Sequence, residues 1–275
     1  EVNDIDPAPC GFCHLTRITY ADQQLWRGGG LPQPIGAMSK QFADGHLIPM
    51  HHHARDQLLF AASGIMRLQT ERRAWLVPAD GAICIPGGTD HSVRMHGVVD
   101  MRTLYIDAAT VPRRPRPLCV ISVSALLRQL ILALSEEPVR YAPGSRADQI
   151  AGLIETEIGL APERALHVPL PTDVRLQRLC GELMAKPSDR RTLDEWSQVA
   201  GASPRTLARL FEQDLGMGFT AWRRRVRFQS AMEALSRGEG VSAVASKHGY
   251  RSPSAFTAAF RKVMGNVPSV IMPGG

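Results

Sequence analysis

The sequence predicts an α+β protein, in which a β-rich N-terminal part and a pair of helices precede an all-α C-terminal part. Three observations lead to this class. Short apolar stretches alternate with polar residues between positions 36 and 107, helical periodicity begins near 122, and no strand pattern follows 172. A chain of 275 residues is long enough for two domains of ordinary size.

The basic charge is concentrated in the C-terminal part. Residues 170–275 hold 16 Lys and Arg against 9 Asp and Glu, a net charge of +7, whereas residues 1–169 carry −1. We therefore expect an anionic partner for one domain only, and nucleic acid is the first candidate.

The composition is that of a globular protein, with 44% hydrophobic residues and no apolar run near the ~18 residues that a membrane helix needs. The five cysteines, an odd number in a long chain, favour reduced thiols over a disulfide framework. The first residues lack the basic and apolar stretches of a signal peptide. We expect a cytoplasmic protein without a membrane partner.

The strand patterns are clearest at 57–64, 65–70, 74–81 and 82–88, where short apolar stretches end at Gly, Pro or a polar residue. Several short strands at this spacing are typical of a β-barrel or a sandwich. The prolines of VPRRPRP (111–117) remove donors from the sheet and end this region.

Two amphipathic helices are predicted next. The stretch SVSALLRQLILALSEE (122–137) places its apolar residues on one helical stripe, and RADQIAGLIETEIGL (146–160) has the same character. The pair is expected either to pack on the β-domain or to pair across a dimer. A linker is predicted at HVPLP (167–171).

The C-terminal part repeats one layout twice, at 192–216 and 241–265. Each segment has a short helix, a turn containing Gly, a Ser-Pro start and an amphipathic helix that ends at Gly. Serine at the N-cap and proline at the first helical position are typical helix starts. This is helix-turn-helix spacing, and one long helix at 218–238 joins the two motifs.

Residues 172–269 resemble the DNA-binding domain of the AraC/XylS family of bacterial transcription regulators. The resemblance rests on the tandem motifs and on GYRSPSAFTAAFRKVMGNVPS (249–269). One departure is VIM at 270–272, where the family usually has Tyr-Arg. The resemblance implies that both recognition helices enter successive major-groove segments of a double-stranded operator.

The family pattern also assigns DNA-binding positions. The residues that would face bases are Arg205, Ala208 and Arg209 in the first motif, and Ser254, Thr257 and Ala258 in the second. The residues expected at phosphates are Arg223, Arg224, Arg225, Arg261 and Lys262.

The N-terminal part contains the stretch MHHHARDQ (50–57). In a strand, period two places His51, His53 and Gln57 on one face, with His52 on the other. His51 and His53 would lie about 6–7 Å apart, and His91 on a later strand would close the site. Three imidazoles suit a divalent transition ion such as Ni, Co, Zn, Cu or Fe, for which Gln57 is a weaker, neutral ligand.

Two segments resemble the cupin motifs. Residues 45–64 match the first motif, with Gln57 where cupins usually carry Glu. Residues 81–91 match the second, one residue shorter between Gly and Pro, and Met95 stands where cupins often have Asn or His. The whole chain thus resembles AraC-family regulators with a cupin-type sensor.

The expected domains are a cupin-like barrel (1–120), a helical coupling and dimerisation segment (121–166), the linker (167–171) and the DNA-binding domain (172–275). The predicted function is a transcription regulator whose barrel senses a divalent metal ion. Its partners would be operator DNA, the effector and a second copy of the chain, with RNA polymerase as a further candidate. Activation and repression both stay open.

Two alternatives to metal sensing are compatible with the sequence. The first is the same regulator with an organic effector and no metal. The second is a metal-dependent cupin enzyme, a dioxygenase or isomerase, which the loss of Glu at Gln57 and the fusion to a DNA-binding domain both disfavour. No catalytic residue is predicted.

The run Cys10-Gly-Phe-Cys13-His14 matches the attachment pattern of c-type haem. Haem attachment requires export, which is not expected here, so an N-terminal arm is the preferred interpretation. A thiolate pair that binds a soft metal or senses oxidation is the alternative.

Overall fold

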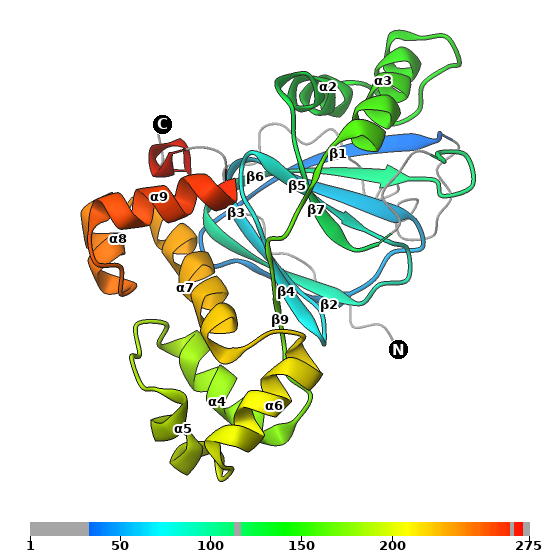
Figure 1. The fold of residues 1–275 in the computed structure, drawn as a ribbon. Coiled ribbons are helices and arrows are strands. Elements are labelled where there is room, and N and C mark those ends of the chain that lie inside the picture. The colour runs from blue at the N-terminus through cyan, green and yellow to red at the C-terminus, as the bar shows by residue number, and fades with distance from the viewer. Residues whose placement is uncertain (1–32, 113–116, 265–266, 272–275) are drawn as a thin grey trace.

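The computed structural model describes residues 33–112, 117–264 and 267–271. The predicted motif at Cys10 and Cys13 lies outside these residues. Nine antiparallel strands form one sheet that the helices flank (Figure 1). The strands are β1 (Ile35–Phe42), β2 (Leu47–His51), β3 (Asp56–Gln69), β4 (Arg73–Val77), β5 (Gly81–Ile85), β6 (His91–Ile106), β7 (Cys119–Ser122), β8 (Glu163–Arg164) and β9 (His167–Pro169).

The two long strands β3 and β6 determine the shape of the sheet. They pair along almost their whole length, with register shifts between Ala61 and Ile65. Gly64 lies in this irregular stretch at φ 78°, where a Cβ atom would lie 2.7 Å from the Val98 carbonyl oxygen. Strands β1, β5, β7 and β8 extend one half of the sheet, and β2, β4 and β9 extend the other.

The sheet is open, which differs from the predicted barrel. The hydrogen-bonded order β1-β6-β3-β5-β7-β8 ends at two separate edges within the described residues. The physical reason is that β3 and β6 are long enough to run through both halves of the sheet. The shorter strands pair with the outer edges of β3 and β6, and among the described strands the two ends of the sheet do not pair with each other.

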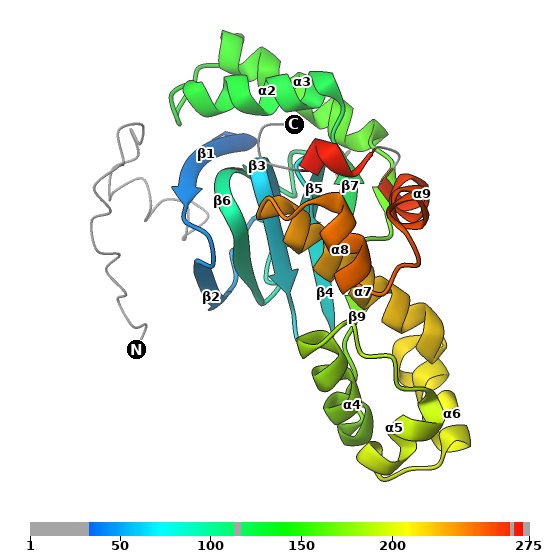
Figure 2. The same ribbon diagram turned by 90° about the vertical axis from the view of Figure 1, so that its left-hand side faces the viewer.

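The predicted helical pair is present as α2 (Ala125–Glu136) and α3 (Arg146–Leu160), capped by Ser124 and Ser145. Of the two predicted placements, packing on the β-domain is observed: Leu127 and Ile131 join the core cluster of Phe60. The pair covers one side of the sheet in both views (Figures 1 and 2).

The chain returns to the sheet after this pair, which differs from the predicted division. Strand β7 continues to Ser122, and β9 pairs with β4 inside the segment that was predicted as a linker. The reason is burial, because Val168 packs with the core of the following helices at 1% exposure.

The two helix-turn-helix motifs are confirmed. Helices α5 (Leu193–Ala200) and α6 (Pro204–Leu215) form the first, α8 (Val241–Lys247) and α9 (Pro253–Met264) the second, and α7 (Phe219–Ser236) joins them; α4 (Val174–Ala185) precedes and η1 (Pro268–Ile271) follows. Local signals explain the helix ends: Ser203 caps α6, and Gly216 ends it in the left-handed conformation.

The helices from α4 onward divide between two cores. The first motif packs with α4 around Trp196, Phe211 and Trp222. The second motif and the C-terminal half of α7 share a core with the sheet, in which Phe228 and Phe260 take part. In Figure 1, α7 lies between α8 and the sheet, and in Figure 2 the helices α4, α5 and α6 extend away from the sheet. Helix α7 thus joins the second motif to the sheet, and the three share one core.

Within the described residues, every helix is too short or too polar to span a bilayer.

Candidate functional site

The three predicted histidines come together at one end of the sheet. His51 is the last residue of β2, and its register partner His91 is the first residue of β6. Nitrogen atoms of His51, His53 and His91 all lie within 4.8 Å of one another. The ring centroids are 4.4 Å apart for His51–His91 and 4.8 Å for His51–His53.

The path of the chain between these histidines differs from the predicted strand. Residues 52–55 turn between β2 and β3, so His53 lies in a turn rather than on a strand face. The turn is held by the loop before β6, because the Gly88 amide donates to the His53 carbonyl oxygen at 2.8 Å. The histidines are therefore brought together by contacts between separate segments, and not by the alternation of side chains along one strand.

Hydrogen bonds fix the chemical form of the imidazoles. His91 Nδ1 lies 2.8 Å from the Thr89 carbonyl oxygen and His51 Nδ1 2.7 Å from that of Pro49, so both Nδ1 atoms donate. A neutral ring then carries its lone pair on Nε2. His91 Nε2 is buried and has no hydrogen-bond partner among the described residues. Burial lowers the pKa of His91 to about 4, which keeps this ring neutral at pH 7.

Gln57 is buried in β3, where its cross-strand partner is Tyr105. The ring centroids of Tyr105 and His53 are 5.1 Å apart. Gln57 Oε1 also lacks a hydrogen-bond partner within the described part of the chain. Coordination by Gln57 stays a prediction. His52, which was expected to point elsewhere, is exposed and lies 2.9 Å from Asp90.

The predicted base-facing residues lie on the outer sides of the two recognition helices. Arg205, Ala208 and Arg209 are exposed on α6, opposite the buried side of that helix. On α9, Ser254 and Ala258 are exposed and Thr257 is half-buried. Both helices thus have a solvent-facing surface at these positions, and the base contacts themselves stay predictions.

The arginine run of α7 is used in part for structure. Arg223 donates to the Arg191 carbonyl oxygen at 2.9 Å, and Arg225 donates to that of His167 at 3.1 Å. Burial lowers the pKa of Arg225. Arg224 is exposed, as are Arg261 and Lys262 at the end of α9. Phosphate contacts remain predictions for all five, and the structural roles of two of them were not foreseen.

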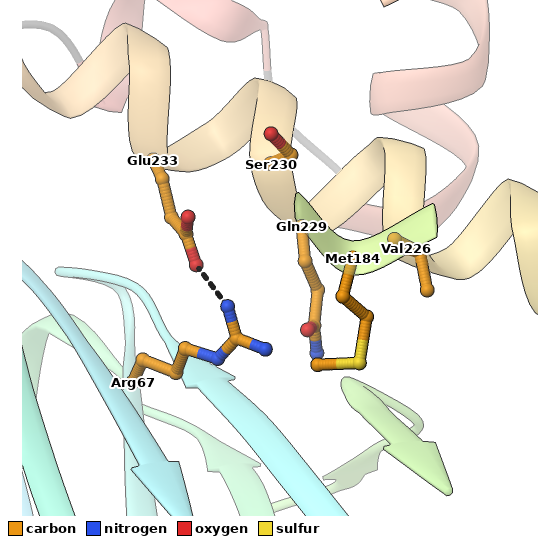
Figure 3. Close-up of a pocket in the computed structure, with 6 residues that line it drawn as sticks. All are labelled: Arg67, Met184, Val226, Gln229, Ser230 and Glu233. Atoms are coloured by element: carbon orange, nitrogen blue, oxygen red, sulfur yellow. Dashed lines mark hydrogen bonds and ion pairs between the residues drawn. The ribbon is translucent and has the colours of Figure 1, made fainter. Parts of the chain in front are cut away.

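A buried polar contact between the sheet and α7 was also missed by sequence reasoning. The Glu233 carboxylate lies 3.4 Å from Arg67 Nη1 (Figure 3). It also lies 3.6 Å from His96 Nε2. Beside it, Gln229 Nε2 donates to the carbonyl oxygens of Ala74 and Leu166. The only signal in the sequence was that the second half of α7 is rich in small and apolar residues, as a helix buried on all sides would be.

The same interface contains a cavity of about 30 Å³, lined by Arg67, Met184, Val226, Gln229, Ser230 and Glu233. This is room for about one water molecule and not for an organic effector.

A sheet domain joined to tandem helix-turn-helix motifs defines a DNA-binding regulator with a separate sensor. Comparison with known proteins agrees. Residues 196–272 match the family model described as "Helix-turn-helix domain". The HTH-type transcriptional regulator NimR of Escherichia coli (strain K12) is 30% identical over 221 residues, which is 80% of either chain.

The chain belongs to the AraC/XylS family of bacterial transcription regulators. A second relative, the HTH-type transcriptional regulator RipA of Corynebacterium glutamicum, is 32% identical over 115 residues, 42% of this chain and 35% of RipA. Since its relatives are named as regulators, the protein is a transcription regulator with an N-terminal ligand-sensing domain, and not an enzyme. ToxT from Vibrio cholerae is a distant structural neighbour, with 12% identity and a TM-score of 0.37 over 88% of this chain and all of ToxT.

Proposed function

We propose that this regulator responds to a divalent transition metal ion held by His51, His53 and His91. The observation that carries the proposal is the convergence of their nitrogen atoms within 4.8 Å. The donor set supports it, since neutral imidazoles are common ligands of Ni, Co, Zn, Cu and Fe. The hydrogen bond from His91 Nδ1 to Thr89 is the outer contact that orients a metal-binding histidine.

The chain contributes three neutral nitrogen ligands from three segments: the end of β2, the turn after it and the start of β6. An ion bound there would supply positive charge and hold these segments together. Gln57 is a neutral fourth ligand, or it leaves that position to water or an effector anion. A cupin-like barrel closed by such an ion is the finer form of this proposal.

Operator recognition is proposed for α6 and α9. Arg205 and Arg209 are suited to guanine, which accepts paired hydrogen bonds from arginine, whereas Ser254 and Thr257 are weaker readers. Arg224, Arg261 and Lys262 would contact phosphates and set affinity and register. The remaining positions, Ala208 and Ala258 facing bases and Arg223 and Arg225 at phosphates, complete the proposed interface.

Strand β6 is the proposed link between the two functions. It begins at His91 and, five residues later, contacts α7 through His96 and Glu233. The neighbouring Gly97 lies so close to α7 that a Cβ atom would be 2.9 Å from the Ser236 carbonyl oxygen. A metal ion that moves the start of β6 would therefore bias the position of the second motif. Such coupling requires that the ion bind two global states with different affinity.

A homodimer through the helical pair is proposed as well. Leu126 on α2 and Leu153 and Leu160 on α3 are 53%, 50% and 75% exposed. Leu153 and Leu160 are seven residues apart and so share one face of α3. Sedimentation analysis of a Leu153→Glu, Leu160→Glu variant should give a monomer where the parent gives a dimer, and an unchanged mass would reject this surface.

The test of metal sensing is elemental analysis of tag-free protein from metal-replete medium. A His51→Ala, His53→Ala variant is compared with His52→Ala, which removes an exposed histidine of the same stretch. We expect about one transition ion per chain in the parent and in His52→Ala, and loss of the ion in the double variant. Operator binding with and without that ion then measures the response.

Absence of metal from all three proteins after reconstitution would reject the proposal. It would leave the organic effector as the interpretation of the sensor domain. Equal metal in all three proteins would place the ion elsewhere in the chain.

A further inference from the structure

Two cysteines lie side by side on neighbouring strands, far along the chain from the Cys10–Cys13 motif. Cys84 lies in β5 and Cys119 in β7, and the antiparallel register pairs them directly. Both are free thiols, 6% and 8% exposed. They belong to the same core cluster, so their side chains lie on one face of the sheet.

The register makes a bond between them geometrically feasible. The Val123 amide donates to the Asp80 carbonyl oxygen at 3.0 Å, which identifies this position as a hydrogen-bonded pair of the ladder. Cys84 lies four residues after Asp80, and Cys119 lies four residues before Val123. Because the two types of pair alternate along an antiparallel ladder, Cys84 and Cys119 also form a hydrogen-bonded pair. The Cα atoms of such pairs are about 5.5 Å apart, and a disulfide spans roughly 4.4–6.8 Å.

The two thiols are chemically unequal. A hydrogen bond from the Cys84 thiol lowers the pKa of Cys119, and Glu163 on β8 opposes this shift. The same contact with Cys119, together with burial, raises the pKa of Cys84. Because the thiolate is the reactive form, Cys119 is the thiol that reacts first.

We propose that Cys84 and Cys119 form a reversible dithiol–disulfide couple, which gives the sensor domain a redox-responsive site with a peroxide as oxidant. The Cys119 thiolate attacks one oxygen of hydrogen peroxide, forming a sulfenic acid and releasing hydroxide. The Cys84 thiolate then attacks that sulfur, forms the S–S bond and releases a second hydroxide. The two thiol protons convert both hydroxides to water, so two thiols and one peroxide give one disulfide and two waters.

A small-molecule dithiol reverses the bond by thiol–disulfide exchange and is itself oxidised to a disulfide. The position of the pair explains how oxidation would reach the rest of the sensor. Strand β5 ends at Ile85, next to Cys84, and the chain then runs through the Gly87–Gly88 loop to His91. The proposal does not depend on metal binding.

The test uses the full chain with Cys10→Ser and Cys13→Ser, which removes the thiols outside the described residues. The folded protein is treated with hydrogen peroxide, blocked with N-ethylmaleimide, digested without reduction and mapped by mass spectrometry. We expect a cross-linked Cys84–Cys119 peptide that dithiothreitol removes. Cys180 is the internal control: it is buried in α4, and burial raises its pKa, so it should stay a thiol.

A Cys84→Ser variant separates the two steps. It should give a Cys119 sulfenic acid, trapped by dimedone, without a cross-link, while circular dichroism confirms that the chain is folded. Recovery of both Cys84 and Cys119 as thiols from the oxidised, folded parent would overturn the proposal. So would a cross-link that forms only in guanidinium, where all the cysteines meet at random.

Discussion

The packing of α7 on the sheet can be tested at a single glycine. Gly97 has φ 74°, and a Cβ atom added there would lie 2.9 Å from the Ser236 carbonyl oxygen on α7. Gly45 has φ 78°, but a Cβ atom there would meet nothing within 4 Å. Gly97→Ala and Gly45→Ala therefore introduce the same backbone strain, and only the first also pushes against α7.

The magnitudes follow from these two terms. The left-handed backbone costs about 1–3 kcal/mol in each variant. Overpacking against α7 adds about 1–3 kcal/mol in Gly97→Ala alone, because the atom that must move is a helix carbonyl and not a flexible side-chain end. For a domain of this size, 1 kcal/mol lowers Tm by roughly 2–4 °C. Gly97→Ala should thus melt about 2–12 °C below Gly45→Ala.

The assay is thermal unfolding of the two metal-free variants and the parent at one pH and salt concentration. Equal melting temperatures for Gly97→Ala and Gly45→Ala would refute the docking of α7 on β6. The proposed route from the histidine cluster to the second motif would then be lost as well. A larger loss in Gly97→Ala, with metal content unchanged, would support that route.

Three further outcomes are expected. Glu233→Gln removes the charge that faces the Arg67 guanidinium on the sheet, so it should lower stability by about 1–3 kcal/mol and weaken any effect of metal on operator affinity. The surface ion-pair variant Glu239→Gln should do neither, and equal melting temperatures of the two variants would contradict this prediction. Arg209→Ala should weaken specific operator binding by ~1–3 kcal/mol, whereas Arg224→Ala should weaken binding to all sequences and flatten the salt dependence of binding. Unchanged binding of Arg209→Ala to the cognate operator would show that α6 is not the recognition helix. Burial lowers the pKa of His248 in the folded chain, so below about pH 6.5 the unfolded chain binds a proton that the folded chain does not, and the unfolding free energy should fall as the pH decreases. A folded His248→Gln variant should show a shallower dependence of unfolding free energy on pH. An identical dependence would count against this histidine.

Several features could be predicted from the sequence because their signals are local. The Ser-Pro starts of α6 and α9 and the glycine end of α6 specify helix boundaries within a few residues of each signal. The same holds for the helical pair, whose stripes of apolar residues predicted both helices. The identity of the histidine cluster was also predictable, since residue type and motif resemblance do not depend on the exact path of the chain.

The geometry of that cluster was decided by tertiary structure. The prediction placed His51 and His53 on one strand, but the chain turns between β2 and β3 because the Gly88 amide holds the His53 carbonyl oxygen. The barrel likewise gave way to an open sheet, since the alternation of apolar residues specifies strands but not which edges pair. The two-residue alternation of a strand pattern predicts neither the turn after β2 nor the open sheet.

The sequence alone determined that this chain carries two helix-turn-helix motifs on a basic C-terminal part and a histidine-rich β-domain before it. Only the tertiary structure decided that the second motif shares its core with that β-domain. The contact of Glu233 with Arg67 joins residues 166 positions apart. Arg225 on α7 likewise donates a hydrogen bond to the His167 carbonyl oxygen on β9. The physical reason is that periodicity reports which face of an element is buried, whereas the partner that buries it is chosen by packing over the whole chain.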